Sequence, residues 1–177
     1  MREQSRQAAE LFEQAISWVQ DHYDTFGFSV ERDVVWTVQS WLRRVIQQQD
    51  LEYGVFNDYP MLPGPRRSRS ADLVIRAADG AGLVAAEFKY EPAHGRPDIL
   101  PQKLPVVFWG AEGVTKDVMR IREFVEAGTV AVAYAVFIDE GSYFRHREPP
   151  AGSTWIDWHS GSPDGYPVSV LWSRWPS

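Results

Sequence analysis

The chain has 177 residues, of which 44% are hydrophobic and 24% charged, the composition of an ordinary globular protein with one domain. It contains no cysteine, which excludes a disulfide scaffold and a zinc–thiolate site. No apolar run is as long as about 18 residues, the length that indicates a membrane-spanning helix, and the N-terminus lacks the apolar stretch of a signal peptide. These features predict a cytoplasmic protein with no membrane partner. The net charge of −6 argues against a non-specific nucleic-acid coat protein, although a local basic patch would suffice for a nuclease.

The spacing of apolar residues predicts two helices at the start of the chain, over residues 6–23 and 30–48. Gly27 separates them, and Ser29 is the expected N-cap of the second helix. Glu31 precedes the apolar stripe of that helix by one turn and on the same face, so we expect it to face inward. The helix dipole alone also favours an acid in a first turn, which is the plainer explanation of Glu31.

A β-hairpin is predicted over residues 70–92. Asp72 opens its first strand, and the glycines of residues 79–82 provide the turn. The second strand carries Glu87 and Lys89, whose side chains project from one face because side chains alternate along a strand, while Phe88 points to the other. Burying an acid and an amine in an otherwise apolar strand is costly, which suggests that they serve a purpose.

This arrangement of Asp72, Glu87 and Lys89 on a hairpin resembles the active-site signature of the PD-(D/E)xK phosphodiesterase superfamily, which has the restriction-endonuclease-like fold. The resemblance implies a Mg²⁺ or Mn²⁺ ion bound by Asp72, Glu87 and the carbonyl of Phe88, with Lys89 activating the attacking water. Many members add an acid from a helix, and Glu31 is the candidate. Ala71 stands where the signature has proline. A surface hairpin with a chance Glu–Lys pair is the alternative.

A proline-rich loop precedes the hairpin and ends in three arginines, at positions 66, 67 and 69. Guanidinium groups bind phosphates through paired hydrogen bonds and stay charged. Because Arg66, Arg67 and Arg69 lie within six residues of Asp72, we expect them to hold a nucleic-acid backbone. A solvated basic loop would have the same sequence. His94, in the irregular segment after Lys89, is a weaker candidate for substrate contact.

The remaining elements complete a predicted order of helix, three strands, helix and strand over about residues 30–138. The first of these strands is expected over residues 51–59. The helix that follows the three strands is expected over residues 114–127, and a buried central strand over residues 129–138. This order matches the αβββαβ core of the family that the hairpin resembles. The expected fold is thus α/β with a mixed sheet, an extra N-terminal helix, and additional β segments after the core, at residues 143–144, 155–158 and 168–172.

The resemblance implies a metal-dependent endonuclease, a hydrolase that cleaves phosphodiester bonds of nucleic acid, with DNA the favoured substrate. One alternative is a non-cleaving scaffold of the same fold that binds nucleic acid or a protein. Another is an unrelated interaction module. The C-terminal β segments are expected to cap the sheet, or to form a homodimer or bind a protein partner.

Overall fold

A mixed six-stranded sheet forms the centre of the molecule in the computed structural model, which describes residues 2–64 and 69–176. The strand order is β1-β2-β3-β4-β6-β5; only β3 and β4 are parallel neighbours. The strands are β1 (Tyr53–Leu62), β2 (Arg69–Ala77), β3 (Gly82–Glu91), β4 (Val132–Glu140), β5 (Ser153–Trp158) and β6 (Val168–Pro176).

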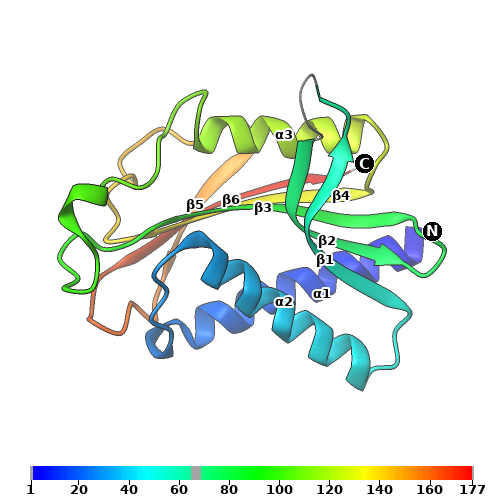
Figure 1. Ribbon diagram of the computed structural model, residues 1–177, viewed down its shortest axis with the longest axis horizontal. Helices are drawn as coiled ribbons and strands as arrows, with labels where there is room; N and C mark the ends of the chain where they lie inside the picture. The colour runs from blue at the N-terminus through cyan, green and yellow to red at the C-terminus, as the bar shows by residue number, and fades with distance from the viewer. Residues whose placement is uncertain (1, 65–68, 177) are drawn as a thin grey trace.

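Helices cover both faces of this sheet (Figure 1). Helices α1 (Arg2–Asp21) and α2 (Glu31–Gln48) pack on one face, and α3 (Val114–Glu126) packs on the other. Parallel strands need a crossover connection, and α3 provides it between β3 and β4. The predicted mixed α/β class is confirmed, as are the N-terminal helix and two of the three expected C-terminal β segments.

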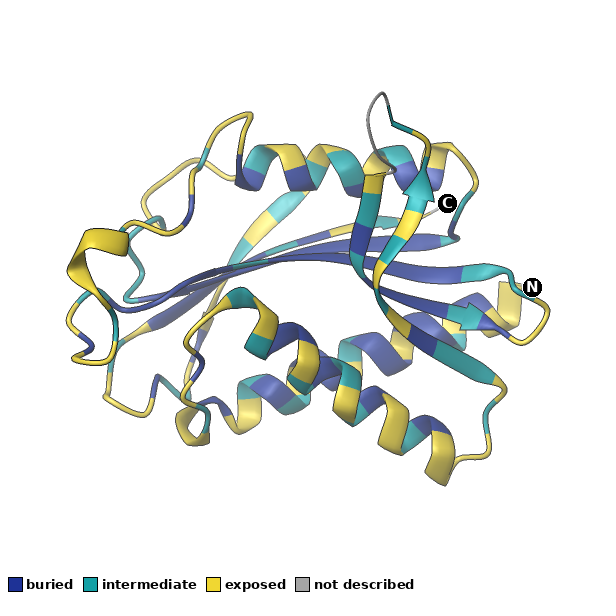
Figure 2. Cartoon of the chain, viewed as in Figure 1, coloured by how far each residue is buried: buried dark blue, intermediate teal, exposed yellow. Residues whose placement is uncertain are grey.

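The core follows from the apolar patterns of the central elements. Every residue of β4 is buried, and nearly all of β3 is, as expected for strands covered on both faces (Figure 2). Helix α1 contributes a fully buried stripe that includes Phe12 and Val19. Phe12 packs 4.6 Å from Tyr134 of β4 and 6.2 Å from Phe88 of β3, measured between ring centroids. The sheet is therefore a rigid support for side chains on its opposite face.

Three local predictions were wrong in detail. Strand β2 begins at Arg69, so Asp72 lies inside the strand rather than opening it. The N-cap of α2 is Val30, not Ser29; the Asp33 carboxylate accepts hydrogen bonds from the backbone N–H groups of both, at 3.0 and 2.8 Å. Residues 143–144 form no strand, because the backbone N–H groups of both donate to the Asp139 carboxylate instead of a ladder.

Within residues 2–64 and 69–176, no helix is both long and apolar enough to cross a membrane.

Candidate functional site

Strand β3 presents Glu87 and Lys89 towards α3, while Phe88 between them packs into the core on the α1 side. The Glu87 side chain is only 1% exposed, whereas that of Lys89 is 26% exposed. The alternation expected from the sequence therefore separates the apolar residue from the two ionisable ones. Glu87 lies at the bottom of the site and Lys89 closer to its opening.

Asp72 on β2 is held directly beside these residues. Leu73 and Ala86 form a pair of the β2–β3 ladder, and Asp72 and Glu87 are the next residues on the two strands. The Asp72 Oδ2 atom accepts a hydrogen bond of 2.7 Å from the backbone N–H of Phe88. One carboxylate oxygen of Asp72 is thus fixed against β3, and the other is left for a further partner.

Helix α2 brings Glu31 to the same site from the other side of the hairpin. The Lys89 ammonium donates to Glu31 Oε2 at 3.0 Å and to the Phe88 carbonyl at 2.9 Å. Glu31 is the first residue of its helix, where an acid interacts favourably with the helix dipole. Both explanations of Glu31 apply: it begins a helix, and it pairs with the lysine of the site.

Helix α3 adds two charged residues that the sequence reasoning missed, Asp117 and Arg120. Asp117 Oδ2 lies 3.1 Å from the Lys89 ammonium, and Arg120 donates to Glu87 Oε2 at 2.9 Å. A signal was present in the sequence. Asp117 falls three residues after Val114 and four before Ile121, on the apolar stripe of the helix, where an unpaired acid would be costly.

Two buried oxygens of this cluster lack a hydrogen bond within the described residues: Glu87 Oε1 and Asp117 Oδ2. Asp117 Oδ2 is nevertheless close to Lys89, so its charge is compensated even though the pair lacks hydrogen-bond geometry. Glu87 Oε1 has no such neighbour. Buried polar atoms are nearly always paired, so this orphan carboxylate oxygen calls for an explanation such as a bound water, a bound ion or a catalytic role.

Burial and mutual repulsion raise the pKa values of Asp72 and Glu87. Burial is the main cause for Asp72, whose pKa rises to about 6, and the charges of Glu31 and Asp117 add to it. Burial, followed by the charge of Asp72, raises the pKa of Glu87 well above its usual range. Burial lowers the pKa of Lys89, but attraction to Asp117 and Glu31 outweighs it, so the pKa of the lysine ends above its ordinary value.

The cluster contains four carboxylates, Glu31, Asp72, Glu87 and Asp117, and the two cations Lys89 and Arg120. When all are ionised, the four negative and two positive charges leave a formal excess of two negative charges. A divalent cation would neutralise that excess. Within the part of the chain that the structure describes, no three acidic or histidine side chains are arranged to hold an ion as they stand. Instead, Lys89 and Arg120 form ion pairs with the carboxylate oxygens of the cluster.

The donor set nevertheless fits Mg²⁺ or Mn²⁺ in chemistry. These ions prefer oxygen ligands, and Mg²⁺ keeps several waters and takes few carboxylates. Asp72 uses only one of its two oxygens in a hydrogen bond with the described residues, Glu87 Oε1 is buried without a hydrogen-bond partner among them, and the Phe88 carbonyl accepts a hydrogen bond from Lys89. The fit of this donor set to a divalent ion depends above all on Glu87 Oε1, the buried oxygen without a hydrogen-bond partner among the described residues.

The predicted basic loop is described only at its end. Arg66 and Arg67 lie outside the described residues. Arg69 forms an ion pair with Glu123 on α3, one turn after Arg120, so it borders the acidic cluster. His94 is held by Glu91 Oε1, at 2.6 Å, and stacks on the ring of Tyr143. These contacts hold His94 against Glu91 and Tyr143, and among the described residues none of the acidic cluster contacts it.

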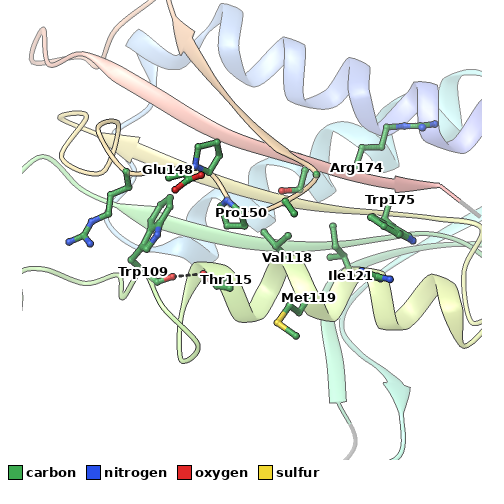
Figure 3. Close-up of a pocket in the computed structure, with 15 residues that line it drawn as sticks. Trp109, Thr115, Val118, Met119, Ile121, Glu148, Pro150, Arg174 and Trp175 are labelled. Atoms are coloured by element: carbon green, nitrogen blue, oxygen red, sulfur yellow. Dashed lines mark hydrogen bonds between the residues drawn. The ribbon is translucent and has the colours of Figure 1, made fainter.

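A cavity of about 670 Å³ lies elsewhere, between α3, β6 and residues 147–152. Figure 3 shows Trp109, Met119 and Trp175 around it. None of the four acids of the cluster lines this cavity. A smaller recess of about 80 Å³ opens directly over Asp72 and Glu31.

The chain matches no protein-family model, no curated protein and no solved structure.

Proposed function

We propose that the protein is a metal-dependent nuclease that hydrolyses phosphodiester bonds of nucleic acid, with DNA the favoured substrate. The observation that carries the proposal is that Asp72, Glu87 and Lys89, from two strands, belong to one charged cluster that includes a buried carboxylate oxygen, Glu87 Oε1, without a hydrogen-bond partner among the described residues. A structural ion-pair network would satisfy its own oxygens. This cluster instead has surplus negative charge and an orphan ligand atom.

The architecture supports the same proposal. The order α2, β1, β2, β3, α3, β4 is the order of the αβββαβ core of the PD-(D/E)xK superfamily, with β3 and β4 parallel and adjacent. In this comparison Asp72 occupies the second strand of the core, and Glu87 and Lys89 the third. Helix α1 and strands β5 and β6 would then be additions to the core.

The proposed ligands are Asp72, Glu87 and the Phe88 carbonyl, with Glu31 as an additional acid from the helix. A bound divalent ion would neutralise charge on the phosphodiester and lower the pKa of a bound water. The chain's own contribution is to orient that water. Lys89 has two acidic partners that favour its protonated form, so we assign it to holding the water through a hydrogen bond rather than to accepting its proton.

Arg120 acts in this proposal as a counter-ion for Glu87. Its guanidinium group contacts Glu87 Oε2, which favours the charged form of the carboxylate and partly offsets the effect of burial on its pKa, while Oε1 keeps no hydrogen-bond partner among the described residues. The same ion pair is the observation that favours the alternative, a non-cleaving scaffold. A permanent Arg120–Glu87 pair in such a protein would replace the ion.

Cleavage assays with Mg²⁺ or Mn²⁺ distinguish the two functions. We expect the wild-type protein to cleave single- or double-stranded DNA or RNA, and Glu87→Gln to lose this activity while retaining its fold. The matched control is Glu112→Gln, which removes an exposed acid before α3 and leaves activity unchanged. Cleavage by Glu87→Gln at the wild-type rate, or by the wild type in excess chelator, would refute the nuclease mechanism. Nucleic-acid binding without cleavage, under every ion tested, would establish the scaffold.

A further inference from the structure

Among the described residues, Trp36 is the one tryptophan that has no ring contact, no cation contact and no place in a core cluster. The other seven each contact a ring, a cation or a core cluster. Trp36 is 55% exposed, and its indole makes no hydrogen bond, ring contact or cation contact with the described residues. An exposed aromatic ring adds little to the core, and the free part of its surface is available to a ligand.

That position is the rim of the acidic site. Trp36 lines the recess of about 80 Å³ together with Glu31, Asp58 and Asp72. At roughly 30 Å³ for each water molecule, the recess holds two or three waters, the space of a hydrated ion or a phosphate oxygen but not of a base. A base attached to a phosphate in the recess would therefore lie outside it, over the rim.

Arg32 completes the arrangement. It lines the same recess and stands four residues before Trp36, so the two side chains are neighbours on the surface of α2. Arg32 is exposed and forms no ion pair or hydrogen bond with the residues that the structure describes. An unpaired cation and an unpaired aromatic ring thus lie together beside two carboxylates of the proposed catalytic site.

We propose that Trp36 is a stacking platform for an unpaired nucleobase adjacent to the phosphate that is cut, and that Arg32 contacts a neighbouring phosphate. This inference rests on the proposed function, since it takes the recess over Asp72 as the place of the reacting phosphate. A base can stack on Trp36 only after leaving its own duplex neighbours. The preferred substrate is therefore single-stranded, or carries an unpaired end or loop, and its base identity matters little, because every base has a π-face.

The test compares two substitutions that differ only in the π-face. Trp36→Phe keeps a ring, while Trp36→Leu keeps an apolar side chain without one. Both are placed in a Glu87→Gln background, so that binding is measured without cleavage. The probe is a short single-stranded DNA containing 2-aminopurine, a fluorescent base whose emission falls when it stacks. A blunt duplex of the same sequence serves as the comparison, and Met119→Leu, at an exposed position on α3, is the control variant.

We expect Trp36→Leu to weaken single-strand binding by about 5- to 150-fold, the range measured for loss of one base–aromatic stack, and to abolish the quenching of 2-aminopurine. Trp36→Phe should retain most of both, and neither variant should change duplex binding or the melting temperature. Unchanged single-strand binding by Trp36→Leu, an equal loss on the duplex, or no single-strand binding by the parent would each overturn the inference. Wild-type cleavage is scored separately. If the wild type cleaves and Trp36→Leu leaves single-strand binding unchanged, only the stacking role of Trp36 is rejected. If single-strand binding depends on Trp36 but the wild type does not cleave, only the nuclease proposal is rejected.

Discussion

Replacing Asp72 by asparagine should stabilise the metal-free protein at neutral pH. Asp72 is mostly buried, and its folded-state pKa is about 6 against an ordinary value of 3.8. Asparagine keeps an oxygen that can accept the hydrogen bond from the Phe88 N–H, so the substitution removes the charge and retains the contact. The native carboxylate is therefore expected to cost stability for the sake of binding, as functional groups often do.

The magnitude follows from the difference between the two pKa values. Below about pH 4 Asp72 is protonated in both the folded and the unfolded state. Between 3.8 and about 6 the folded state holds a proton that the unfolded state has lost, so stability falls as the pH rises, and above about pH 6 the loss is complete. The difference between the folded-state pKa of about 6 and the ordinary value of 3.8, at about 1.36 kcal/mol for each pH unit, corresponds to about 3 kcal/mol of stability. Because Asp72 is partly exposed and solvent screens it, we expect about 1–3 kcal/mol for Asp72→Asn.

Urea denaturation followed by tryptophan fluorescence measures this difference. In chelator at about pH 7.5, the midpoint for Asp72→Asn should lie above that of the wild type, and the difference should shrink towards about pH 4. Asp164→Asn, at an exposed turn position, should show no difference. Saturating Mg²⁺ should reverse the order, because an ion at about 1,000 times its dissociation constant stabilises the wild type by about 4.1 kcal/mol. An Asp72→Asn protein that is no more stable than the wild type in chelator would refute the argument.

Three further predictions concern other parts of the molecule. Asp117→Asn removes a buried partner of Lys89, so we expect kcat for nucleic-acid cleavage to fall at least about tenfold with little change in KM; an unchanged kcat would mean that Asp117 has no positioning role. Arg96→Met leaves the buried carboxylate of Glu140 without its cation and should destabilise the fold by about 3 kcal/mol in urea denaturation; an unchanged midpoint would contradict this. Neutralising the three arginines at 66, 67 and 69 should weaken duplex binding equally on all sequences and lower the slope of log K against log salt by up to about 2.7, at about 0.9 for each lost contact. Binding titrations at several salt concentrations test this, and an unchanged slope would show that the loop does not touch the phosphates.

Local sequence patterns were enough to predict the main elements and part of the site. Period-two alternation places Glu87 and Lys89 on one face of β3, and the apolar stripes of the helices predicted α2 and α3 to within a residue at each end. The apolar run after α3 predicted a buried strand, although β4 begins three residues later than expected and extends to Glu140. Such patterns depend on geometry that repeats along the chain, so a single sequence contains them.

The tertiary structure alone decided which residues share the site. Asp117 is 28 residues from Lys89 in the sequence, and their contact exists only because α3 crosses over β3 on its way to β4. The pairing of β6 between β4 and β5, and the exposure of Trp36 beside Asp72, likewise depend on how distant segments pack. No local propensity encodes these distances. The same composition and periodicity would permit a solvated Asp117 and a buried Trp36, and the packing of α2 and α3 against the hairpin selects the opposite arrangement.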